Sequence, residues 1–172
     1  MFSKTSFLFL LMVLGFSMSF AQILEIEEKK PVTENGIEYG YIIKNEQTKA
    51  NKGEEYSRYE IALYATNRSG CSKIYADKRS FLSGNENPNL IATFNCNNAN
   101  GKRLTAKAGT VKARDFYLTV RIDENGKEVN RSVKAGYIFR NGETIKDNII
   151  VLVPKGDRPL IQCTLNSLPE LQ

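Results

Sequence analysis

Four Asn-Gly dipeptides divide this chain into short segments, and they constrain its fold more than any other feature. They lie at Asn35-Gly36, Asn100-Gly101, Asn125-Gly126 and Asn141-Gly142. Asn and Gly both tolerate the positive φ angles that tight β-hairpin turns require. The segments between the dipeptides are rich in Tyr, Ile, Val, Phe and Thr, which are enriched in strands. We therefore expect short antiparallel strands joined by tight turns.

Several segments show the alternation of a strand, and helical periodicity is not evident after residue 21. The clearest is 116–122, in which Phe116, Leu118, Val120 and Ile122 share one face and Tyr117, Thr119 and Arg121 the other. The polar stretch 45–55 is expected to be a long hairpin loop or a mobile lid, and 76–89 a crossover loop. The expected strands are 23–27 (an edge strand), 37–44, 56–67, 90–95, 103–112, 116–122, 132–139, 149–153 and 160–165.

This number of strands with regular turn signals predicts an all-β fold, an antiparallel two-sheet β-sandwich of the immunoglobulin-like type. An open β-barrel is the alternative. Residues 22–172 have the length of a single domain with its own core.

Residues 1–21 have the organisation of a secretory signal peptide. Lys4 supplies one positive charge, and an uncharged apolar run follows from residue 7 to residue 20. Small residues at Ser19 and Ala21 fit the site that signal peptidase cleaves. A membrane anchor is the alternative, but a span needs about 20 apolar residues and this run is shorter. We expect cleavage after Ala21, export to the periplasm or the exterior, and no transmembrane segment in the mature chain.

The chain has no His and no Trp. The absence of His excludes Ser/His and Cys/His catalytic arrangements and removes the commonest ligand for transition metals. Loss of Lys4 with residues 1–21 lowers the formal net charge by one, from +5 to +4, which weakly favours acidic polymers as partners. An exported protein seldom meets nucleic acid, so that partner is not expected. No cofactor and no metal are expected either.

Three cysteines remain for the oxidising environment outside the cytoplasm: Cys71, Cys96 and Cys163. Strand alternation places Cys96 and Cys163 on core-facing positions, and Cys71 follows a Ser-Gly turn. One disulfide, between Cys96 and either Cys71 or Cys163, is one expectation. Three small buried or half-buried thiols is the other.

A basic sheet face is the main candidate binding site. Lys112 and Arg114 are expected to share one face, and Tyr117 and Arg121 one face of the next strand. Guanidinium groups beside a Tyr could bind a sulfated or phosphorylated glycan or an anionic lipid head group. The ordinary interpretation is the solvated face of an antiparallel sheet.

Carboxylates provide the only catalytic candidates, because a glycoside hydrolase needs two acids at a defined separation. The candidates are Asp77, Asp115, Asp123, Asp147 and Asp157. Nothing in the sequence brings two of them together, and acids in turns are common.

Segment 59–70 (YEIALYATNRSG) resembles a strand and turn of bacterial immunoglobulin-like sandwiches. Together with 92–96 (ATFNC) and 100–105 (NGKRLT), it resembles a group of small secreted bacterial proteins. The resemblance implies the fold class and export, and it contains no catalytic motif.

The hypothesis we prefer is an exported, non-catalytic β-sandwich that binds an envelope protein or an anionic surface glycan. A secreted carboxylate-dependent glycoside hydrolase or a carbohydrate-binding module is one alternative. A soluble accessory component of an envelope transport system is another.

Overall fold

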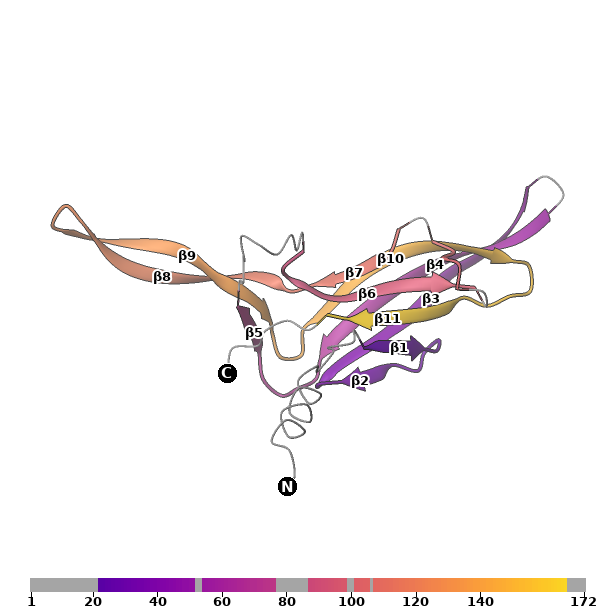
Figure 1. Cartoon of the computed structure of the whole chain (residues 1–172), viewed down its shortest axis with the longest axis horizontal. Coiled ribbons are helices and arrows are strands. Elements are labelled where there is room, and N and C mark those ends of the chain that lie inside the picture. The colour runs from indigo at the N-terminus through magenta and orange to yellow at the C-terminus, as the bar shows by residue number, and fades with distance from the viewer. Residues whose placement is uncertain (1–21, 52–53, 77–86, 99–100, 106, 167–172) are drawn as a thin grey trace, which may run out of the picture.

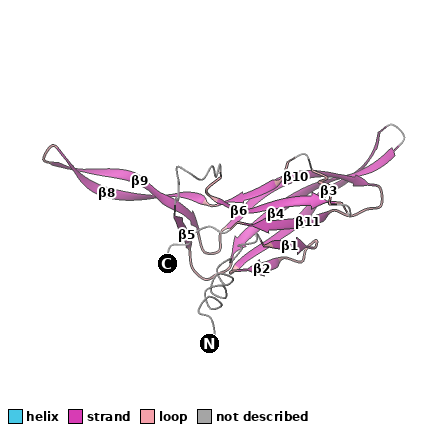
Figure 2. Cartoon of the chain, in the orientation of Figure 1, coloured by secondary structure: helices cyan, strands magenta, loops and turns pink. Residues whose placement is uncertain are grey.

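The computed structural model describes residues 22–51, 54–76, 87–98, 101–105 and 107–166. The predicted signal peptide and most of the predicted crossover loop lie outside these residues. The described part of the chain is built from antiparallel strands (Figures 1 and 2). It contains no helix long and apolar enough to cross a membrane.

The strands form three antiparallel sheets. Sheet 1 has the order β1-β11-β6-β7, sheet 2 the order β10-β4-β3-β2, and sheet 3 the order β5-β9-β8. In the described residues these sheets stay open and do not close into a barrel, so the barrel alternative is not realised. The bounds are β1 Ile23–Ile26, β2 Val32–Glu34, β3 Ile37–Asn51, β4 Glu54–Asn67, β5 Lys73–Ala76, β6 Leu90–Asn97, β7 Gly109–Lys112, β8 Arg114–Glu124, β9 Lys127–Phe139, β10 Thr144–Pro154 and β11 Leu160–Leu165.

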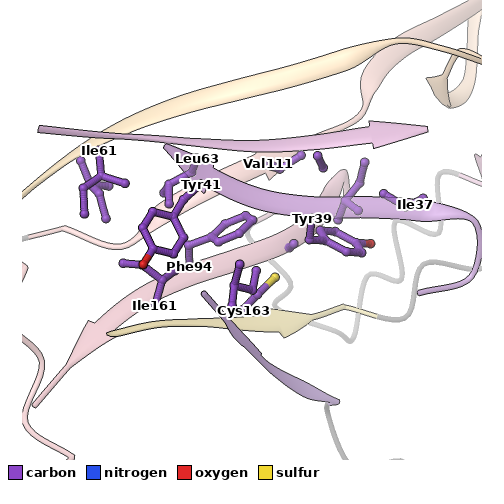
Figure 3. Packing of buried hydrophobic residues seen from close by; sticks show 14 of the residues in the cluster. Ile37, Tyr39, Tyr41, Ile61, Leu63, Phe94, Val111, Ile161 and Cys163 are labelled. Atoms are coloured by element: carbon purple, nitrogen blue, oxygen red, sulfur yellow. The ribbon is translucent and has the colours of Figure 1, made fainter. Parts of the chain in front are cut away.

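Sheets 1 and 2 enclose the core (Figure 3). Alternate residues of β4, including Ile61 and Leu63, are fully buried and meet Phe94 of β6 and Ile161 of β11. Such burial supplies the main favourable free energy of folding. Two sheets around one apolar core fit a sandwich-like arrangement.

Close packing along one side of the core requires a glycine. A Cβ atom on Gly109 of β7 would lie 2.0 Å from Leu63 Cδ1, so a larger residue would force either the Leu63 side chain or β7 to move. The next backbone N–H, from Thr110, donates a hydrogen bond to Asp147 Oδ2 of β10 at 2.8 Å. This contact ties the edge of sheet 1 to the edge of sheet 2.

Most of the expected strands are confirmed, and the described part of the chain holds two that were not expected. β11 has the predicted bounds, and β1 is an edge strand as predicted. The prediction for 45–55 was wrong, because β3 and β4 pair as far as Asn51 and Glu54. The Tyr59 hydroxyl supports this extension by donating to Glu46 Oε1 at 2.8 Å. β2 and β5 were missed because each is only a few residues long.

The Asn-Gly turns fall into two groups. Asn35-Gly36 and Asn125-Gly126 have positive φ at both residues and close the β2–β3 and β8–β9 hairpins, as expected. Asn141-Gly142 instead joins β9 of sheet 3 to β10 of sheet 2, so it is a link between sheets and not a hairpin turn. Asn100 lies outside the described residues.

The fully buried side chain of Asn67, at the end of β4, joins the base of sheet 3 to sheet 2. Its Nδ2 donates to the carbonyl oxygens of Phe139, at 2.8 Å, and Cys71, at 2.9 Å. Its Oδ1 accepts hydrogen bonds from the backbone N–H and the hydroxyl of Ser69. Buried polar groups need such partners because leaving one unpaired is costly.

Replacing this amide should therefore destabilise the protein. We expect Asn67→Ala to lower the free energy of unfolding by about 3 kcal/mol, because the carbonyls of Cys71 and Phe139 lose their donor. Denaturant unfolding followed by circular dichroism measures the change. The control is Asn130→Ala, at an exposed position, which should have little effect. Equal stability of the two variants would contradict this role for Asn67.

Candidate interaction surface

Most of β8 and the first half of β9 extend away from sheets 1 and 2 as a two-stranded arm (Figure 1). We define the arm as residues 117–134. β9 changes character along its length, because Tyr137 and Phe139 are buried in the core whereas the residues from Lys127 to Val133 are exposed. A register shift beside Phe116 and Tyr117 marks the change from body to arm.

Cross-strand pairing gives the arm two different faces. Leu118 lies opposite Val133, Val120 opposite Arg131, and Ile122 opposite Val129, which confirms the predicted alternation in β8. Directly opposed residues share a face, so the apolar side chains of both strands line one side. We call this side the apolar arm face, and its apolar members are Leu118, Val120, Ile122, Val129 and Val133; Arg131 lies on the same side, opposite Val120. The opposite side is the polar arm face, with members Tyr117, Thr119, Arg121, Asn130, Ser132 and Lys134.

The apolar arm face is uncovered in the described part of the chain. Leu118 and Val133 are each 48% exposed, and Val120 and Val129 are exposed as well. β8 pairs with β9 alone. A two-stranded hairpin without further support is only marginally stable in water, and a contiguous exposed apolar patch commonly marks an interaction site. The alternation predicted which residues share this face. It could not indicate whether another part of the chain covers the face.

The structure does not gather Lys112, Arg114, Tyr117 and Arg121 on one face, so the predicted basic face needs correction. Lys112 ends β7 in sheet 1, whereas the other three lie on β8 in sheet 3. Arg114 is an odd number of residues from Tyr117 and Arg121, and β8 has no extra residue between them. Period-two alternation therefore places it on the opposite face.

Nearby acids and amides also engage these basic side chains. Arg114 Nε lies 2.5 Å from Glu143 Oε1, and Arg121 Nη1 lies 3.6 Å from Glu128 Oε2. Lys112 Nζ donates to the side-chain oxygen of Asn87 at 2.7 Å. The surface around the arm therefore carries both positively and negatively charged side chains.

The base of the polar arm face holds a further ion pair. Lys134 Nζ lies 2.6 Å from Asp115 Oδ1 and 4.3 Å from the centre of the Tyr137 ring. The hydrogen bond to Asp115 raises the pKa of Lys134 above its ordinary value. The positive charge of Lys134 is thus paired with Asp115 and lies against the Tyr137 ring, both in sheet 3.

Of the candidate acids, Asp115, Asp123 and Asp147 have structural partners for their carboxylates. Asp123 Oδ1 accepts a hydrogen bond from the Gly126 N–H at 2.7 Å and so closes the arm's turn. Asp147 accepts hydrogen bonds from the backbone N–H groups of Thr110 and Asn148. Asp77 lies outside the described residues. Within them, no three His, Cys, Asp or Glu side chains form a group that could hold a metal ion.

All three cysteines are free thiols, so the described chain contains neither of the bridges expected for Cys96. Cys96 and Cys163 are fully buried, as their strand positions predicted, and Cys71 is exposed. Cys96 lies opposite Ile161 and Cys163 opposite Phe94, so the two thiols are diagonal neighbours. Diagonal Cα atoms are about 7–8 Å apart, beyond the usual span of a disulfide.

Thiol labelling should distinguish these environments. Burial raises the pKa of the Cys96 thiol to about 11 and that of Cys163 to about 12, so neither forms the reactive thiolate near neutral pH. We expect one thiol per folded chain, Cys71, to react with an alkylating reagent at pH 8, and all three to react in denaturant. Mass spectrometry counts the labels. Fewer than three labels on the denatured, unreduced chain would reveal a disulfide.

The outer face of sheet 2 also exposes apolar side chains, namely Ile42, Ile150 and Leu152. Here Ile150 pairs with Glu60 and Leu152 with Arg58, and these two charged residues form an ion pair with Nη1 2.6 Å from Oε1. Charges therefore interrupt the apolar residues of this face. The apolar arm face has more apolar residues, and Arg131 is the one charged side chain that lies among them in the described chain.

Comparisons with known proteins add no relative to this picture. No protein-family model matches the chain, and no curated protein or solved structure shows a significant match to it. The function has to be argued from the chain's own surfaces.

The arm's exposure predicts that its apolar residues contribute little to the stability of the body. We expect Leu118→Thr/Val133→Thr to change the free energy of unfolding by less than about 1 kcal/mol, because Thr retains the preference for strands. Leu63→Ala, in the fully buried core, should cost about 3 kcal/mol. Thermal and denaturant unfolding measure both variants. A large loss in the arm variant would mean that the body depends on this face.

Proposed function

We propose that this chain is an exported, non-catalytic, immunoglobulin-like β-sandwich that binds a protein of the cell envelope through its arm. The observation that carries the proposal is the uncovered apolar arm face. Sheets 1 and 2 act as the body that presents it.

The chemistry of this face defines the partner. Its surface is mostly apolar, with Arg131 between Val129 and Val133, and Arg131 forms an ion pair with Glu124, which lies nearer the tip. A complementary protein surface has apolar side chains over Leu118 and Val133 and polar groups that meet this ion pair. An anionic polymer is the weaker candidate, because the cations nearby already face acids of the same chain.

A binding role also agrees with the positions of the acids. Asp123 and Asp147 accept hydrogen bonds from backbone N–H groups, which is a structural role. The sequence has no His to serve as a general base. The hydrolase alternative would need a pair of acids facing a common cleft.

Crosslinking in the native host tests this function. A photo-reactive amino acid placed at Val120 should crosslink the mature protein to an envelope protein. The same probe at Thr119, on the polar arm face, should crosslink less to that protein. Adding Leu118→Thr/Val133→Thr should reduce the Val120 product at least tenfold, since these changes remove apolar contact area without unfolding the body.

The matched control exchanges Thr119 and Ser132, which oppose each other on the polar arm face. Thr119→Ser/Ser132→Thr should leave the Val120 product unchanged. Equal crosslinking of wild type and the apolar variant would contradict the role of this face. Polysaccharide hydrolysis that disappears on an Asp→Asn change would replace the proposal with the enzyme hypothesis.

A further inference from the structure

The outer edge of β8 is a second unpartnered feature of the arm, distinct from its apolar face. β8 ends the strand order of sheet 3 and pairs only with β9. It contains no proline, and the extra residue at the register shift, Ala135, belongs to β9. Natural edge strands are usually short, bulged, interrupted by proline or covered.

Other outer strands in the described chain have such protection. β1, β2, β5 and β7 have four residues or fewer. β10 is long, but it forms a bridge between Val151 and Thr105 and contacts the N–H of Thr110 through Asp147. β8 is the one long outer strand without these devices among the described residues.

The sequence of β8 is complementary to itself when read in the opposite direction. On the face of the even-numbered residues, it begins with Arg114, ends with Glu124 and has four apolar residues between them. An antiparallel copy centred on Thr119 places Arg114 opposite Glu124 at both ends. It also places Phe116 opposite Ile122, and Leu118 opposite Val120. A two-fold axis requires this reciprocity, because each contact occurs twice.

Neighbouring registers do not give this match. Centring the pair on Val120 places Phe116 opposite Glu124, and centring it on Leu118 places Arg114 opposite Ile122. A shift that pairs odd with even residues would set apolar side chains against the polar arm face. Only the register centred on Thr119 joins opposite charges at both ends and apolar residues between them.

The odd-numbered residues are compatible with the same register. Tyr117 would lie opposite Arg121, where a guanidinium can contact the ring. Asp115 would lie opposite Asp123, and this is the one like-charge pair. Each of these acids has a partner in its own chain, because Lys134 Nζ lies 2.6 Å from Asp115 and the Gly126 N–H donates to Asp123.

Charges at each end would alternate across the two copies. Glu124 faces Arg131 of its own chain, and Arg114 faces Glu143 of its own chain. Bringing Glu124 of one copy to Arg114 of the other produces the order Arg131, Glu124, Arg114, Glu143. Every charge in this row has only opposite neighbours, which favours association.

We propose that β8 binds β8 of a second copy of this chain, antiparallel and centred on Thr119. The product is a four-stranded arm in which β9 strands flank the two β8 strands. Its apolar face doubles in area and becomes continuous across both copies. The inference concerns the edge of β8, so it goes beyond the proposed function of the apolar arm face.

Cysteine crosslinking tests the register directly. Thr119 lies on the proposed two-fold axis, where opposed Cα atoms are about 4.5–5.5 Å apart. In a Cys71→Ser background, which removes the exposed thiol, Thr119→Cys should form a covalent dimer under mild oxidation or with a short bifunctional thiol-alkylating crosslinker. Non-reducing electrophoresis measures the dimer fraction.

The matched control is Ser132→Cys in the same background. Ser132 is exposed and lies opposite Thr119 on β9. In the proposed dimer the two Ser132 positions are three strand spacings apart, about 14 Å. We expect at least tenfold less covalent dimer than with Thr119→Cys. Equal crosslinking at both positions would indicate random collision and overturn the register.

Charge reversal provides an independent test in solution. Glu124→Arg places like charges opposite Arg114 twice in the dimer, and we expect self-association to weaken at least tenfold in sedimentation velocity. Arg114→Glu/Glu124→Arg restores opposite charges between the copies but sets each reversed side chain beside a like charge of its own chain, Glu143 or Arg131, so it should associate more tightly than Glu124→Arg alone without reaching wild type. Failure of the double variant to recover association would contradict the proposed pairing.

The outcomes separate this inference from the proposed function. A chain that stays monomeric at about 100 µM has a dimer Kd well above that concentration, and this result overturns the self-pairing. If its Val120 probe still crosslinks to an envelope protein, the proposed function stands without it. A monomer with no arm crosslinks overturns both.

Discussion

The packing of β4 against β6 and β11 is the interaction on which the rest of this structure depends. Ile61 and Leu63 project from β4 into a layer that Phe94 and Ile161 complete from the other sheet. Sheet 3 is then attached to this core by Tyr137 and Phe139 at the end of β9. Without that anchor, the β8–β9 hairpin would be an isolated ribbon of marginal stability.

The division of β9 into a buried and an exposed half explains how a small protein can present a long arm. The buried half contributes side chains to the core, and the buried amide of Asn67 holds its end. Within the part of the chain that the structure describes, the exposed half is supported only by pairing with β8. The stability of the body and the composition of the arm are therefore largely independent. A binding surface can change on such an arm without loss of the fold.

Sequence reasoning succeeded where the signal was local and failed where it depended on distant segments. The pattern of 116–122 predicted the two faces of β8, and Asn125-Gly126 predicted its turn. The stretch 45–55 looked like a loop because it is polar, yet pairing between β3 and β4 carries it outward as a hairpin. The predicted basic face failed because Lys112 ends a strand of sheet 1 whereas Arg114 begins β8 of sheet 3, on the face opposite Tyr117 and Arg121.

What the sequence by itself determined is the all-β class, the antiparallel hairpins and the inward position of Cys96 and Cys163. These follow from side-chain alternation and from residues that accept positive φ, which act over a few positions. Only the tertiary structure decided which apolar faces are covered. Leu63 and Leu118 both lie in strongly alternating strands, but one is fully buried and the other is half exposed. The difference arises because burial depends on whether another sheet lies above the face, and no local pattern records that.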